Sequence, residues 1–449
     1  MSSSGPTASP TPVRRLGPAE QLRVLTTVLL PPVLKGPIVR RPSAVDLAAR
    51  LDLDSAGATT MRRLRERHGP GPVQLGAAGR RLALLLDPAD VGRVLDGTPA
   101  PFTPATLEKR GALNHFEPEQ ALVSDAQKRL ARRPLNERVL ETFRPVHSHA
   151  STMTAAIEEE VAGLLGHADF TGGLDWDGFA TAWWRIVRRI VLGDGAREDE
   201  RLTDDLRRLR ERGNFAYLAP QDRRRRERFL RGLEGHVDRA EPGSLAALVA
   251  REPADGETAP VQQIPQWLFA FDAAAWATFR ALALLTAHPE AAEAARQETA
   301  GAPELPLLRA SVLESLRLWP TTPLLLRDTT EETTWSTGTL PEGTGIVVFA
   351  PYFHRDERFQ GERAHRFAPE LWADAIEQAT PVLVPFSGGP GMCPGRDVVL
   401  LTASTVLGEL LRRRTLTPRT PLRTDRLPGT LSPFSLAFDV QPVRTVGPL

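Results

Sequence analysis

The 449-residue chain contains a single cysteine, Cys393. One thiol forms no internal disulfide, no CxxC redox pair and no multi-thiolate zinc or iron–sulfur site. Two chemical roles remain for it, a nucleophile or a single thiolate ligand. A nucleophile requires an adjacent base, and residues 386–396 offer none at neutral pH. The sequence therefore favours a lone ligand.

The segment around Cys393 supports this interpretation. Six of the ten residues from Phe386 to Gly395 are glycine or proline, which is typical of a tight loop whose backbone approaches a neighbour closely. A helical pattern begins near Gly395. Free amides and the dipole at a helix start favour a thiolate. An iron atom held by one sulfur needs such a setting.

Composition narrows the class of protein. The 56 basic and 55 acidic residues give a formal charge of +1, which does not indicate a nucleic-acid partner. Apolar residues make up 41% of the chain, and no stretch reads as the roughly 20 apolar residues that cross a bilayer, so we expect no membrane association and a cytoplasmic location. Only Lys35, Lys109 and Lys128 are lysines, which is typical of a GC-rich bacterial genome.

The order of predicted elements is uneven. Residues 1–19 are rich in Ser, Pro and Thr and read as a disordered tail. Residues 20–449 show no repeat and no linker, so we expect one domain. Short strand patterns at 73–85 and 329–350 flank a long helical stretch that includes a central helix at 265–287, and another helix follows at 395–413. The pattern predicts a mainly α fold with a small β region.

At this point the sequence resembles a known family. Phe386, Gly389, Cys393 and Gly395 match FxxGxxxCxG, the haem-ligand loop of the cytochrome P450 family. The resemblance covers about residues 20–449, although the N-terminal third matches by pattern only. It implies the cytochrome P450 fold, haem b as the cofactor and Cys393 as the axial ligand of the haem iron.

The family's ExxR helix motif is matched by Glu314 and Arg317. Alone, a Glu/Arg pair three residues apart is a common solvated pair. The resemblance implies instead a buried network that braces the ligand loop. Its third member is usually an Arg at the position of Leu371, and we expect the nearby Arg366 to replace it.

Basic side chains neutralise the haem propionates in this family. Lys128, Arg132 and Arg327 stand at the matching positions, and Gly391 stands where a His or Arg is common. If Lys128 and Arg132 face the propionates, Arg129 and Arg133 face outward. With residues 412–414, that outward pair would then form a basic patch for an acidic ferredoxin.

The central helix departs from the family pattern. Its usual acid is Asp272, but the following Thr is Ala273. An acid and a hydroxyl normally relay the protons that oxygen activation needs, and Ala273 can neither donate a proton nor hold a water. Thr278 lies six residues from Asp272, about 240° around the helix, and cannot substitute.

Three functional hypotheses follow. In the first, a hydroxyl or amine of the substrate completes the relay, in a monooxygenase or oxidative cyclase that makes a bacterial specialised metabolite. In the second, the protein uses peroxide or acts as a dehydratase, isomerase or nitrogen–oxygen-bond enzyme. In the third, it is a non-catalytic auxiliary partner, which the retained Cys393 disfavours. The resemblance implies a ferredoxin and its NAD(P)H-dependent reductase as electron donors. A carrier protein is a further candidate partner, because a basic run at 223–226 follows the family's mobile lid.

The resemblance also implies which residues border a small-molecule substrate. These are Phe269, Ala270, Phe116, Phe215, Leu324 and Phe434.

Overall fold

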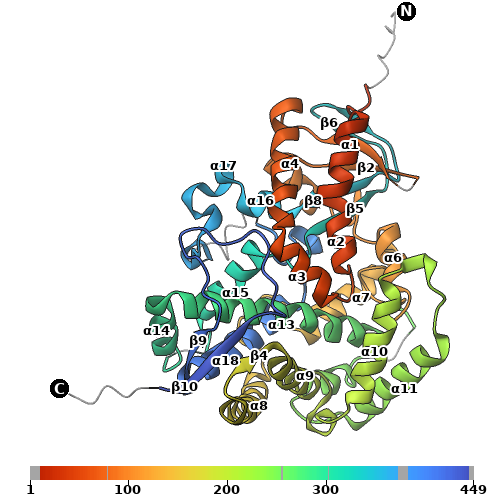
Figure 1. The fold of residues 1–449 in the computed structure, drawn as a ribbon. Helices are drawn as coiled ribbons and strands as arrows, with labels where there is room; N and C mark the ends of the chain where they lie inside the picture. The colour runs from red at the N-terminus through yellow and green to blue at the C-terminus, as the bar shows by residue number, and fades with distance from the viewer. Residues whose placement is uncertain (1–10, 78, 254–255, 302, 373–382, 444–449) are drawn as a thin grey trace, which may run out of the picture.

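A computed structural model describes residues 11–443 except 78, 254–255, 302 and 373–382. Helices dominate it, and the strands gather at one end of the molecule and beside α18 (Figure 1). The mainly α prediction with a small β region is confirmed. The helices are α1 (Pro18–Val24), η1 (Leu25–Leu29), α2 (Leu30–Lys35), α3 (Pro42–Arg50), α4 (Leu53–His68), α5 (Pro88–Asp96), α6 (Leu107–Leu113), α7 (Ala126–Val139), α8 (Ala150–Thr171), α9 (Trp176–Leu192), α10 (Glu200–Gly213), α11 (Arg223–Arg239), α12 (Leu245–Val249), α13 (Ile264–Ala287), α14 (Pro289–Glu298), α15 (Pro306–Leu318), α16 (Ala350–Arg355), α17 (Glu357–Gln360) and α18 (Arg396–Arg413), with short helical turns η3 (Ala216–Leu218), η6 (Pro369–Trp372) and η7 (Gly389–Gly391).

The strands form three small sheets among the described residues. The largest has the order β1-β2-β8-β5-β3, in which β2 and β8 run parallel and the other neighbours antiparallel. A second sheet has the order β4-β10-β9, and β6 pairs with β7. The strands are β1 (Val73–Ala77), β2 (Arg80–Leu84), β3 (Phe102–Thr103), β4 (Leu174–Asp175), β5 (Leu324–Thr329), β6 (Thr333–Trp335), β7 (Gly338–Leu340), β8 (Gly345–Phe349), β9 (Arg414–Pro418) and β10 (Ala437–Pro442).

The prediction that residues 1–19 form a disordered tail is wrong for residues 11–19, which are ordered in the structure. Val13 and Leu16 are buried, and the amide of Val13 donates to the carbonyl of Thr339 at 3.0 Å. Two apolar side chains in a Pro-rich segment carry no periodic signal, yet they cover an apolar face of the sheet region and remove it from water. Residues 1–10 lie outside the described residues. The single-domain organisation of the rest remains a prediction.

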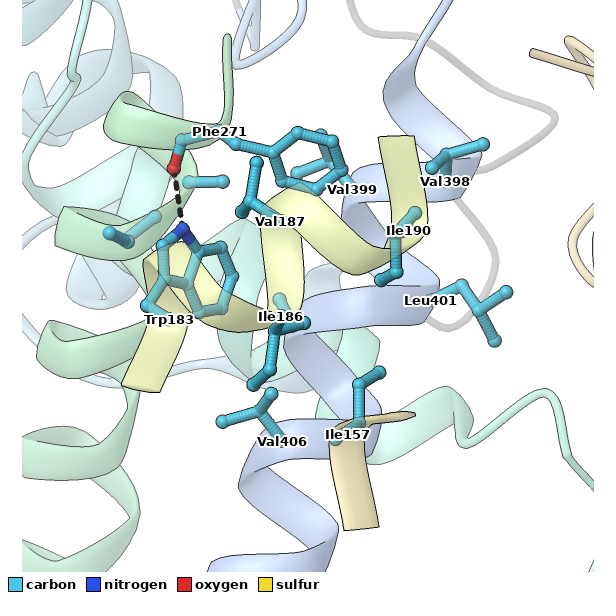
Figure 2. Packing of buried hydrophobic residues seen from close by; sticks show 14 of the residues in the cluster. Ile157, Trp183, Ile186, Val187, Ile190, Phe271, Val398, Val399, Leu401 and Val406 are labelled. Carbon is cyan, nitrogen blue, oxygen red and sulfur yellow. Dashed lines mark hydrogen bonds between the residues drawn. The ribbon is translucent and has the colours of Figure 1, made fainter. Parts of the chain in front are cut away.

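Helix α13 runs through the centre of the main core. It is apolar on all sides, which is the pattern of a helix buried all round. Figure 2 shows Phe271 of α13 against α9, where the indole N–H of Trp183 donates to the Phe271 carbonyl at 2.9 Å, with Val399 of α18 close by. The same helix is long and apolar enough to cross a membrane by length and composition, contrary to our reading of the sequence. Because 78% of that window is buried inside the protein, α13 acts as a core helix here.

Candidate functional site

The loop before α18 holds Cys393 in a fixed position. The amide of Cys393 donates to the carbonyl of Phe386 at 2.9 Å, and the amide of Met392 donates to the carbonyl of Gly389 at 3.0 Å. Gly389 has a φ of +55°, and a Cβ there would lie 2.4 Å from the carbonyl oxygen of Leu95, so only glycine fits. Together these bonds turn the loop back on itself directly in front of α18.

The Cys393 sulfur lies at the start of α18, where Gly395 is the residue before the first helical turn. Burial raises the pKa of the Cys393 thiol, whereas the amide of Gly395, by hydrogen bonding to the sulfur, acts to lower it. A half-buried thiol with one amide donor is well suited to ligate a metal, because the metal replaces the proton.

The sulfur opens into a cavity of about 300 Å³ between this loop and α13. Its walls are largely apolar and include Phe386, Phe269, Ala270, Ala273 and Leu325. Four basic side chains also line it, namely Lys109, Arg129, Arg133 and Arg327. Within the described part of the chain, no aspartate or glutamate lines this cavity. An apolar ligand that carries carboxylates matches these walls.

The cations supplied by α7 are not the predicted ones. Arg129 and Arg133 line the cavity, whereas Lys128 is half exposed and faces Glu119 at 3.8 Å. Arg132 is buried but pairs with Glu119 and donates to Ser124 Oγ at 2.8 Å, outside the cavity lining. The residues that line the cavity are therefore each one position later in the chain than the predicted Lys128 and Arg132. One position rotates a side chain by about 100° around the helix axis, so the predicted pair points away from the cavity.

The register follows from how α7 starts and where it packs. The Asp125 side chain accepts from the Lys128 amide at 2.9 Å and caps the helix. Arg133 donates to the carbonyl of Met392 at 2.6 Å, and Arg129 donates to the carbonyl of Pro390 at 3.3 Å. Both therefore reach the ligand loop, and the outward basic patch predicted for them is wrong.

Arg327 on β5 is placed as predicted. It is buried, lines the cavity and donates to Ser387 Oγ at 3.0 Å. A Cβ on Gly391 would lie 2.8 Å from Arg327 Nη2, so the missing side chain at 391 makes room for this guanidinium. Burial, followed by the charge of Arg129, lowers the pKa of Arg327 to about 10.

Lys109 on α6 is a cation that the sequence did not single out. Its ammonium donates to the carbonyls of Pro104 and Leu326 at 3.1 and 3.0 Å. Burial lowers its pKa well below the usual range, and the charge of Arg327 adds to the shift. Clustered cations that depress one another's pKa indicate a site for an anion.

Glu314 and Arg317 on α15 form the predicted buried pair. Neither side chain is exposed, and two parallel hydrogen bonds of 2.6 and 2.8 Å join them. Arg317 also donates to the backbone carbonyls of His354, Ala364, Arg363 and Arg366. A charged pair buried this deeply is stable only because its remaining donors and acceptors are satisfied.

The third side chain of this network is Trp372. Its indole N–H donates to Glu314 Oε1 at 2.8 Å. The Arg366 side chain is exposed, and only its backbone carbonyl takes part, so the predicted replacement was wrong. Trp372 follows Leu371 directly, but an indole in place of a guanidinium departs from the family's motif.

His354 connects this network to the ligand loop. Its Nδ1 lies 3.2 Å from the carbonyl of Arg317, and its Nε2 lies 3.0 Å from the amide of Val384, two residues before Phe386. The amide can only donate, so Nε2 accepts and Nδ1 carries the proton. Burial, followed by the charge of Arg317, lowers the pKa of His354 to about 3, so the ring is neutral.

The distal side of the cavity is formed by α13. Ala270 and Ala273 line it, but Asp272 is not among its lining residues. The Asp272 carboxylate pairs with Arg210 of α10, whose guanidinium also donates to the carbonyl of Ile38 at 3.2 Å. Asp272, the predicted relay acid, is thus engaged away from the cavity. Thr278 donates to the carbonyl of Ala274 at 2.8 Å and does not replace the missing hydroxyl.

The predicted substrate-bordering residues separate into two groups. Phe269 and Ala270 line the cavity, and Phe116 packs edge-on against Phe269 with ring centroids 5.6 Å apart. The other three do not line this cavity. Phe215 is exposed, Leu325 lines the cavity instead of Leu324, and Phe434 lines a second, smaller cavity.

Comparisons with known proteins agree with this geometry. Residues 262–434 match the sequence model of the family described as Cytochrome P450. The chain is 34% identical over 144 residues to secologanin synthase 2 of Catharanthus roseus, covering 29% of this chain and 27% of that protein. It is 34% identical over 116 residues to cytochrome P450 52A3-A of Candida maltosa, covering 23% of this chain and 22% of that protein.

A third relative is the putative cytochrome P450 cyp-13B1 of Caenorhabditis elegans, 33% identical over 158 residues, which is 32% of this chain and 31% of that protein. The chain spans less than a third of the length of the curated relatives it matches. The cytochrome P450 family binds haem b, an apolar macrocycle with two carboxylates. The lone half-buried thiol, the apolar walls and the four cations all fit that group. The matched motifs and this geometry therefore agree with the similarity of residues 262–434 to the cytochrome P450 family.

Proposed function

We propose that this protein is a haem-thiolate oxidoreductase of the monooxygenase type that acts on a small molecule. The observation that carries the proposal is the position of the Cys393 sulfur, which opens into an apolar cavity facing Ala270 and Ala273 of α13. A haem bound through one thiolate supplies oxygen activation, because electron donation by the sulfur favours O–O cleavage.

The residues around the cavity have separable roles in this proposal. Cys393 would ligate the haem iron, and Arg129, Arg133, Arg327 and Lys109 would pair with the two propionates. Each cation is already anchored to backbone or side-chain oxygens, so little side-chain entropy is lost when the propionates bind. The apolar side chains of α13 exclude bulk water from the opposite face.

Proton delivery depends on the substrate. Ala273 carries no proton, and the Asp272 carboxylate is paired with Arg210. A hydroxyl or amine of the substrate, placed beside Ala273, would supply the hydrogen bond that a threonine usually gives. This supports a biosynthetic monooxygenase or oxidative cyclase for a specialised metabolite, with a ferredoxin and its NAD(P)H-dependent reductase as electron donors. A carrier protein partner, a bacterial source and a cytoplasmic location remain predictions.

The decisive test is the absorption spectrum of the reduced protein with carbon monoxide. The purified holoprotein should give the thiolate-type Soret band, and Cys393→Ser should lose it while retaining the cavity. A native protein that takes up haem but gives no such band would refute the proposal.

The relay is tested separately with Ala273→Thr. If the native substrate completes the relay, the added hydroxyl leaves the coupling of electron use to product nearly unchanged. A large gain in coupling would show instead that the relay is simply broken. Because the cavity offers no side-chain acid at Ala273, peroxide-driven, dehydratase, isomerase or nitrogen–oxygen-bond chemistry is the second candidate. Turnover with hydrogen peroxide alone, exceeding turnover with the ferredoxin system, would favour that candidate.

A further inference from the structure

A second cavity lies farther along α13, toward its C-terminal end. It measures about 30 Å³, and Trp276 and Arg280 of α13 line it together with Thr321 and Phe434. Thr321 lines both cavities, so the two spaces are neighbours. Ala273 and Arg280 are seven residues apart, which is about 10 Å along the helix axis.

Basic side chains surround this second cavity. Lys35 of α2, Arg40 and Arg280 line it, and Asp54 is the one acid among its described lining residues. Lys35 uses both oxygens of Asp54, at 2.9 and 3.0 Å, so these two charges cancel. Asp54 Oδ2 also accepts a hydrogen bond from Thr430 Oγ1 at 2.9 Å. Within the described part of the chain, the guanidinium groups of Arg40 and Arg280 therefore form no ion pair with a carboxylate.

The backbone satisfies these guanidinium groups only in part. Arg40 donates to the carbonyls of Gly36 and Thr321 at 2.7 and 2.6 Å and lies over the Trp276 ring. Arg280 donates to the carbonyls of Trp319 and Leu431 at 3.2 and 2.6 Å. Its Nε has no acceptor among the described residues, although the side chain is only 8% exposed.

The electrostatics agree with a missing anion. Burial, together with the charge of Arg40, lowers the pKa of Arg280 to about 9, and burial lowers the pKa of Arg40 to about 10. The charge of Asp54 acts to raise the pKa of both guanidinium groups, and Asp272 adds to this for Arg40, but Asp54 is paired with Lys35 and Asp272 with Arg210. An unsatisfied buried donor on a charged group is costly, and an anion in the cavity would offset that cost.

We propose that the second cavity is a subsite for a carboxylate group of the substrate, which Arg280 and Arg40 bind. This inference rests on the proposed function, because the same substrate would place its reacting carbon beside Ala273. A space of about 30 Å³ holds roughly two waters, which is the size of one carboxylate. The substrate class is thus an apolar molecule with a carboxylate about 10 Å from the reacting position.

Binding of decanoate and methyl decanoate to the holoprotein, measured by equilibrium dialysis, tests this inference. Decanoate should bind about tenfold or more tightly than the ester, because charge-assisted hydrogen bonds distinguish the two. Thermal unfolding in sodium acetate and in sodium chloride at one ionic strength then tests whether a free carboxylate enters as well, since a ligand of the folded state raises the Tm.

Arg280→Gln and Arg40→Gln should bring the two affinities within about twofold of each other. Arg280→Lys, which keeps the charge, should restore part of the preference. The matched control is Arg355→Gln, because Arg355 is equally buried and donates to the Leu427 and Pro428 carbonyls outside the cavity lining. This control should keep the preference for decanoate.

The outcomes of these experiments separate the carboxylate subsite from the proposed haem-thiolate function. If acetate raises the Tm only when Arg280 is present, but decanoate has no advantage over its ester, the cavity binds a free anion and the substrate assignment is overturned. If neither carboxylate binds to a protein that shows the thiolate-type band, the subsite is refuted while the haem-thiolate proposal stands. Absence of that band counts against the proposed function instead.

Discussion

The identity of the third side chain in the α15 network gives a sharp prediction. Trp372→Phe removes the indole N–H that donates to Glu314 Oε1 at 2.8 Å but keeps an aromatic ring at a buried position. Glu314 accepts four hydrogen bonds, two from Arg317 and one each from the Ala368 amide and the Trp372 indole. The substitution leaves a fully buried carboxylate with three.

The expected cost follows from the charge of the acceptor. A hydrogen bond to a charged group contributes about 1.5–3 kcal/mol, and the smaller ring leaves a gap that costs about 1 kcal/mol more. We therefore expect Trp372→Phe to lower the free energy of unfolding by about 3 kcal/mol. Arg366→Ala, which removes an exposed side chain and keeps the carbonyl that Arg317 uses, should stay within about 0.5 kcal/mol of the native protein.

Urea unfolding of the holoprotein, followed by far-ultraviolet circular dichroism and by haem absorbance, measures both variants. A double-mutant cycle with Glu314→Gln isolates the hydrogen bond, because Trp372→Phe should cost less once the acceptor is neutral. Equal losses for Trp372→Phe and Arg366→Ala would refute the reasoning. So would an unchanged cost of Trp372→Phe in the Glu314→Gln background.

Three further results are expected. Arg129→Gln should speed haem loss about tenfold, measured by transfer to apomyoglobin, whereas Lys128→Gln should leave the rate unchanged. A larger effect of Lys128→Gln would show that Lys128, as predicted from the sequence, faces the haem. The pKa of His354 is lowered from 6.5 to about 3, so the unfolded chain binds more protons in that window and stability falls as pH drops below about 6.5. The slope should reach about 1.4 kcal/mol per pH unit, and His354→Gln should flatten it in urea titrations at several pH values. Gly389→Ala should cost several kcal/mol because its Cβ meets a carbonyl at 2.4 Å, whereas Gly395→Ala, whose nearest neighbour lies at 3.6 Å, should cost less than about 1 kcal/mol in the same assay.

Side-chain direction was the hardest feature to predict. The sequence places two cations four residues apart on α7, but 128/132 and 129/133 fit that spacing equally well. The choice depends on the rotation of the helix about its axis, which the Asp125 cap and the contact with the Pro390 and Met392 carbonyls set. Asp272 shows the same limit, since its partner Arg210 lies 62 residues away in the chain.

Local chemistry let the sequence alone predict a lone thiolate at Cys393, its glycine-rich loop and the mainly α fold, whereas the burial of the Glu314–Arg317 pair was implied by the family resemblance. Each depends on residue types and spacings within one segment, where backbone geometry dictates what is possible. Tertiary structure decided which cations face the cavity, that Trp372 completes the Glu314 network and that Asp272 is held by Arg210. It also brought Arg40 and Arg280 together in the lining of one cavity. These features join segments far apart in the chain, and only packing brings such segments together.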